Sequence, residues 1–180
     1  MGKIRINQTV VKALLIYGGF IWLIALLIVL PHFSDLLPAT ENLGVSHVSI
    51  IDTTYFAWRV PLTFLFFSLI HTKWSILFPT AWYYAMFAIW ALVVIFLFIK
   101  GQFWSGSFFL LHTLAFGASI YFFSLVALRT VHNNMYIKSD HYLGRWLGAV
   151  KMSVQEYWIE LISAYLGFLF LNIFLDNYLK

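Results

Sequence analysis

The sequence predicts an all-α integral membrane protein, a polytopic bundle of five transmembrane helices with one amphipathic helix at the membrane surface. Hydrophobic residues make up 62% of the chain and aromatic residues 21%, whereas soluble domains contain about 45–50% apolar residues. Only eleven Lys or Arg and seven Asp or Glu occur, and most of them fall between five apolar stretches. Lipid offers no hydrogen-bond partners to the backbone, so each span has to be helical.

The five stretches are each about long enough to cross a hydrocarbon core of roughly 30 Å. They cover residues 13–30, 55–70, 81–99, 107–128 and 157–175. The longest gap between them, residues 129–156, is shorter than the roughly 40 residues that a marginal soluble domain needs. We therefore expect one membrane domain over residues 1–180.

The first stretch, residues 13–30, follows the basic residues Lys3, Arg5 and Lys12, as the core of a signal peptide would. Its apolar run exceeds the typical core of about 7–15 residues, and no A-x-A cleavage motif follows closely. We expect a retained membrane anchor.

The second stretch, residues 55–70, is the shortest and contains Arg59 and Pro61. The alternative to a full crossing is a re-entrant segment, which would reverse the side on which every later loop lies. That reversal would place the four bases of residues 129–151 outside, so the charge distribution favours a crossing.

Charge asymmetry sets the orientation, because cytoplasmic loops are enriched in Lys and Arg. With a cytoplasmic N-terminus, eight Lys or Arg lie in the cytoplasmic segments, and only Lys100 and Lys180 lie in the segments on the outer side. Five spans then put the C-terminus outside. The interfacial aromatic residues expected at span ends are Trp74, Trp82, Tyr83 and Tyr84 inside, Phe103 and Trp104 outside, and Tyr157 and Trp158 inside.

Between the fourth and fifth stretches, residues 142–154 have helical amphipathic spacing, with Arg145, Lys151 and Ser153 largely off the apolar stripe. This pattern is typical of a helix lying in the interface. It serves as a simple connector or as a docking surface for a partner or anionic lipid. The residues expected on its buried side are Leu143, Trp146, Leu147 and Val150.

Ionisable groups at membrane depth are candidate functional positions. From a rise of about 1.5 Å per residue, Arg59 and His112 share a layer near the outer face, with Asp52 above it. His71 and Glu160 lie near the inner face, with Lys73 and Glu156, and Glu160 is the acid expected to matter most. The alternative for each is structural: an ion pair, or a side chain that reaches the headgroups.

The same depths weaken the case for bis-histidine haem ligation by His71 and His112, which differ in depth by roughly 15 Å. His132 and Asp140-His141 match no zinc spacing. The chain has no Cys, and it lacks catalytic signatures such as G-x-S-x-G or H-E-x-x-H. We expect no catalytic residues and no metal site, with haem or quinone binding left as an alternative.

The sequence thus predicts a non-enzymatic subunit or scaffold of a larger membrane complex, of the secretion, conjugation or respiratory type. The alternative is a small transporter or a haem- or quinone-binding redox subunit. Expected partners are the lipid bilayer and other membrane subunits, and the net charge of +4 follows the topology rather than indicating nucleic-acid binding. The expected location is a bacterial inner membrane.

Overall fold

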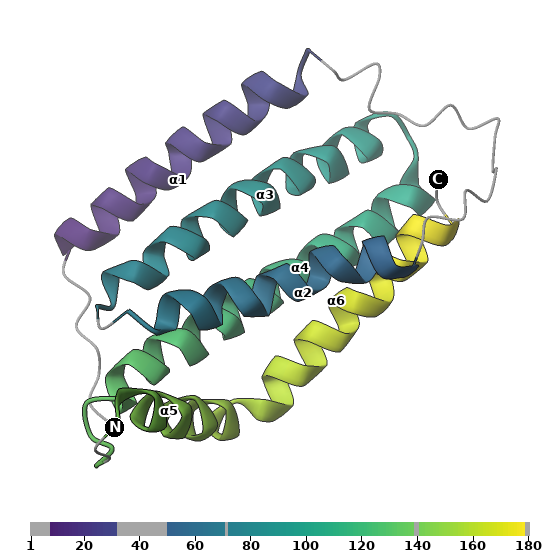
Figure 1. Ribbon diagram of the computed structural model, residues 1–180. Coiled ribbons are helices and arrows are strands. Elements are labelled where there is room, and N and C mark those ends of the chain that lie inside the picture. The colour runs from purple at the N-terminus through teal and green to yellow at the C-terminus, as the bar shows by residue number, and fades with distance from the viewer. Residues whose placement is uncertain (1–7, 32–49, 71, 139–140, 179–180) are drawn as a thin grey trace.

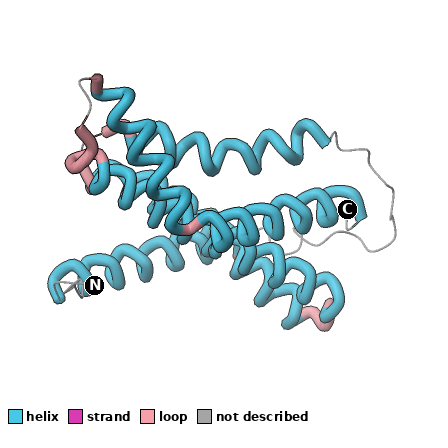
Figure 2. The backbone as a smooth tube through the Cα atoms, turned by 90° about the horizontal axis from the view of Figure 1, so that it is seen from below, coloured by secondary structure: helices cyan, strands magenta, loops and turns pink. Residues whose placement is uncertain are grey.

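The computed structural model describes residues 8–31, 50–70, 72–138 and 141–178. Within these ranges the chain forms α-helices joined by turns, and Figure 2 shows no strand. The helices are α1 (Gln8–Val29), α2 (Ile50–Ser68), α3 (Trp74–Ile99), α4 (Phe103–Asn133), α5 (Tyr142–Glu156) and α6 (Trp158–Tyr178). The all-α prediction is confirmed.

Five of the helices run side by side and alternate in direction along the chain, while α5 crosses one end of the bundle (Figure 1). We call this the α5 end, where α1 and α6 begin and where α2 and α4 finish. At the far end, Gly101 turns α3 into α4 with a φ of 74°. Its N–H donates to Phe98 O, and the N–H of Gln102 donates to Leu97 O, each at 3.0 Å. This is a Schellman motif, in which glycine avoids the steric penalty of positive φ.

Two of the described helices, α3 and α4, are long and apolar enough to cross a membrane. They contain the third and fourth predicted spans. Shorter apolar segments, Ile16–Ile28 and Trp158–Ile173, lie within the first and fifth predicted spans. Both long helices extend past the predicted bounds, α3 from Trp74 and α4 to Asn133.

The core is aromatic and centred on α4, which contacts α2, α3, α5 and α6. Phe116 of α4 is fully buried. Its ring centroid lies 4.4 Å from that of Trp90, 5.1 Å from Phe168 and 6.3 Å from Tyr83. Such tilted and edge-on pairs each add roughly 0.5–1.5 kcal/mol beyond area burial, so α3, α4 and α6 are held at one point.

The predicted surface helix exists as α5, but its protein-facing side differs from the prediction. The Tyr142 hydroxyl donates to Leu69 O, and the Trp146 Nε1–H donates to Ser68 Oγ at 3.0 Å. Ala149 and Ser153, on the same face at helical spacing, are buried.

Leu143 and Leu147 are 62% and 59% exposed, so of the residues expected on the buried side Trp146 contacts the bundle and these two leucines do not. They lie about 100° around the helix from the packed face. The apolar stripe and the bundle-facing side are therefore two different faces of α5.

Candidate functional site

His112, one of the predicted buried polar residues, is only 4% exposed. Its Nε2 lies 3.1 Å from Asn172 Oδ1 of α6. The imidazole packs against Trp90 and Phe168, with ring centroids 4.7 and 5.4 Å away. The hydrogen bond and the ring contacts together join α3, α4 and α6, which is a structural use of this histidine.

Arg59 does not share these partners. It is exposed, and its guanidinium lies over the Tyr55 ring at 4.4 Å from the centroid. The side chain of Asp52, expected in the same layer, lies outside the described residues. The partner of His112 is instead Asn172, which a search for ionisable residues passes over because an amide carries no charge.

The inner layer is described only in part. His71, the expected partner of Glu160, lies outside the described residues, and Glu160 is exposed in the first turn of α6. An acid at this position is favoured by the helix dipole. The neighbouring Glu156 pairs with Arg129, with Oε1 and Nη2 3.4 Å apart. No group of three or more His, Asp or Glu among the described side chains could hold a metal ion.

A pocket of about 740 Å³ lies between α1, α3 and α4. Ligand sites typically enclose about 300–1,000 Å³. We call it the α1–α3–α4 pocket. Its lining is mostly apolar, from Tyr17, Gly18, Leu77, Thr80, Ala81, Tyr84, Phe87, Leu114, Gly117, Ala118, Ile120, Tyr121 and Ser124.

Small side chains create the room in this pocket. Ala81 of α3 and Ala118 of α4 lie in its walls. At Gly117 an added Cβ would meet Phe87 Cε2 at 2.8 Å, so glycine there lets the Phe87 ring lie directly against α4.

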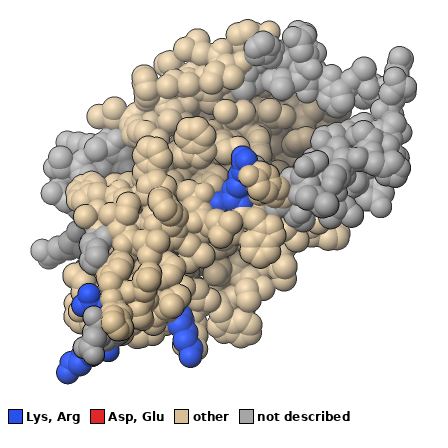
Figure 3. Space-filling model, in the orientation of Figure 1, with Lys and Arg blue, Asp and Glu red and all other residues tan. Residues whose placement is uncertain are grey.

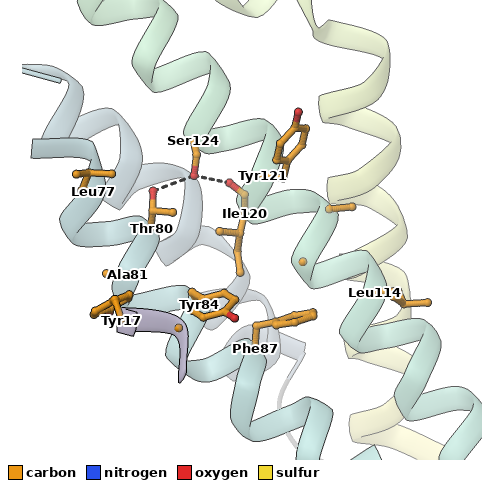
Figure 4. A pocket seen from close by; sticks show the side chains of 13 residues that line it. Tyr17, Leu77, Thr80, Ala81, Tyr84, Phe87, Leu114, Ile120, Tyr121 and Ser124 are labelled. Carbon is orange, nitrogen blue, oxygen red and sulfur yellow. Dashed lines mark hydrogen bonds between the residues drawn. The ribbon is translucent and has the colours of Figure 1, made fainter. Parts of the chain in front are cut away.

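Two hydrogen-bonded groups interrupt the apolar lining. Thr80 Oγ1 and Ser124 Oγ lie 3.0 Å apart and bridge α3 to α4 at one end of the pocket (Figure 4). Farther along α3, the Tyr84 hydroxyl accepts a hydrogen bond from Trp22 Nε1–H of α1 at 3.1 Å. Since α1 contacts only α3 among the described helices, this bond is part of a narrow attachment.

The pocket runs along the bundle and opens sideways. From Leu77 to Phe87 it follows α3 for about 15 Å, at about 1.5 Å rise per residue. The α4 side chains at its edge are exposed, 55% for Leu114 and 59% for Tyr121. Thr80 and Leu77 lie toward the α5 end, because α3 begins there.

Basic side chains gather at the α5 end. Lys73, Arg129, Lys138, Arg145 and Lys151 all belong to segments that meet there. In Figure 3 most of the visible blue side chains lie at the lower left, where α5 lies, and one more lies near the middle of the face; no red side chain is visible on the described part of that face.

Comparisons with protein-family models, curated proteins and solved structures found no match to this chain.

Proposed function

We propose that the chain is an integral membrane protein with five spans, namely α1, α2, α3, α4 and α6, and that it works as a non-catalytic subunit of a larger membrane complex. In this arrangement the N-terminus and α5 lie on the cytoplasmic side and the C-terminus lies outside. The expected membrane is a bacterial inner membrane.

One observation carries the membrane assignment, namely the apolar outer surface of the described helices. Exposed large apolar side chains occur on α1, α2, α3, α4 and α6, among them Phe20, Phe66, Phe78, Leu111 and Phe170. Soluble monomers rarely expose contiguous apolar patches larger than a few hundred Å². A hydrocarbon solvent accounts for this surface along the whole length of the bundle.

The orientation is supported by the basic α5 end. Five of the described bases lie there, and Lys100 lies in the turn at the far end. The apolar face of α5 that contains Leu143 and Leu147 points away from its bundle contacts, as expected for a helix lying in the inner interface.

The role as a subunit is supported by the thin attachment of α1. This helix contacts α3 alone among the described helices, and side chains such as Ile16, Phe20 and Leu23 remain exposed. A peripheral helix with free aromatic and aliphatic faces suits packing against a neighbouring membrane protein. Glu160 is exposed at the end of a proposed span, where a neighbouring membrane protein could contact it.

A small transporter or a redox subunit is the alternative, and the buried imidazole of His112 favours it. Haem bound at this residue would give a Soret band in the absorption spectrum of the purified protein. Replacing His112 with Ala would then remove that band.

The test is cross-linking in the intact membrane, followed by purification and native mass spectrometry. We expect the chain to co-purify with other membrane proteins at fixed stoichiometry and to show no Soret band. A chain isolated only as a monomer, or one that moves solute in vesicles by itself, would contradict the role as a non-catalytic subunit.

A further inference from the structure

We propose that the α1–α3–α4 pocket holds one hydrocarbon chain of an anionic phospholipid whose headgroup lies at Lys73. This inference rests on the membrane assignment above and adds a ligand to it.

The shape of the pocket fits a lipid chain. It is apolar and follows the bundle for about 15 Å from Leu77 to Phe87, so its long axis lies in the direction that lipid chains take. The exposed edge at Leu114 and Tyr121 allows a chain to enter sideways from the bilayer.

A transmembrane helix of a partner protein is a poorer fit to the pocket. With a diameter of about 10 Å, a 15 Å length of helix fills roughly 1,200 Å³. The pocket offers about 740 Å³. A single chain enters this space without moving α1 away from α3.

The pocket also has a pair of hydroxyl groups near the α5 end, where the polar part of a lipid would begin. Near the α5 end, the Thr80 hydroxyl lies 2.7 Å from Ile76 O, and the Ser124 hydroxyl lies 2.7 Å from Ile120 O. The opposite end is formed by side chains such as Phe87, which suits the end of a hydrocarbon chain.

Charge complementarity identifies the headgroup as anionic. Lys73 occupies the N-cap position of α3 with a helical backbone conformation, and it is exposed. It lies one turn, about 6 Å, before Leu77. It continues the stripe of α3 that lines the pocket, at spacings i, i+4, i+7, i+8, i+11 and i+14. The stripe consists of Lys73, Leu77, Thr80, Ala81, Tyr84 and Phe87.

The experiment uses the full chain in vesicles of equimolar phosphatidylglycerol and phosphatidylcholine, released for native mass spectrometry. We expect one retained lipid on the wild type, with phosphatidylglycerol preferred. Lys73→Gln should reduce that preference about fivefold, from the roughly 1 kcal/mol that one surface base contributes to anionic lipid binding. Lys100→Gln, at the far end, should leave it unchanged.

Filling the pocket with Ala118→Phe should abolish retention of both lipids, while Leu111→Phe, at an exposed position of α4 outside the pocket, should not. A wild type that inserts into vesicles but retains no lipid would overturn the inference, as would retention unaffected by Ala118→Phe. A photoreactive side chain at Tyr121 that labels protein in place of lipid would also overturn it. Failure to insert at all, measured by carbonate extraction, would instead contradict the membrane assignment.

Discussion

Removing the Tyr84 hydroxyl is expected to weaken the attachment of α1 to α3. The Trp22 indole N–H can only donate, and the Tyr84 oxygen 3.1 Å away is the acceptor it uses. Tyr84→Phe keeps the ring, which stacks on Phe87 with centroids 6.2 Å apart. The substitution therefore removes the hydrogen bond and little else.

The magnitude follows from the environment of the bond. Hydrogen bonds between membrane helices contribute about 0.6 kcal/mol on average, up to about 1.7 kcal/mol. Packing at the same interface is worth more. Ala25 and Ala88 are buried there, at 2% and 0% exposure, and forcing a larger side chain into such a contact costs about 1–3 kcal/mol. We therefore expect Tyr84→Phe to loosen α1 and Ala88→Leu to displace it.

A double-mutant cycle isolates the bond. The free energy of unfolding in mixed micelles would be measured for the wild type, Trp22→Phe, Tyr84→Phe and the double variant. We expect a coupling energy of about 0.6–1.7 kcal/mol. A coupling indistinguishable from zero would refute the role of this bond in holding α1.

Three further outcomes are expected. Phe116→Ala should lower the free energy of unfolding by about 3–5 kcal/mol, because its fully buried ring contacts three other aromatic rings; a loss below 1 kcal/mol would contradict its central place. Trp146→Phe removes the hydrogen bond to Ser68 and should weaken the attachment of α5 to the bundle by about 1 kcal/mol. Protease should then digest α5 faster than in the wild type; unchanged digestion would contradict this role of the bond. Glu160→Gln should lower the amount of assembled complex while activity per complex stays constant; normal assembly with lost function would indicate a proton- or cation-binding carboxylate.

The positions of the helices could be predicted from the sequence, because each depends on a run of neighbouring residues. The apolar stretch 107–128 lies inside α4, and the amphipathic segment 142–154 lies inside α5. Helix ends were less accurate. Lys100-Gly101 ended α3 close to the predicted limit, but the apolar run of residues 81–99 gave no sign that α3 begins at Trp74.

The neighbours of each side chain could not be predicted, because sequence gives the depth of a residue in a span but not the direction in which its helix faces. His112 was expected at membrane depth, and its side chain is buried within the bundle. Arg59, which was expected in the same layer as His112, faces outward over Tyr55. The side chain that hydrogen-bonds to His112 is Asn172. The pocket was not predicted for the same reason, since it depends on how three helices meet.

The five-span arrangement is tested most directly by determining the side of the membrane on which Lys100 and Lys138 lie. The chain has no cysteine, so Lys100→Cys and Lys138→Cys each carry a single thiol that a membrane-impermeant maleimide can report in intact cells. We expect labelling of Lys100→Cys from outside, and labelling of Lys138→Cys only after the membrane is opened. Labelling of both variants from the same side would contradict the alternating five-span arrangement.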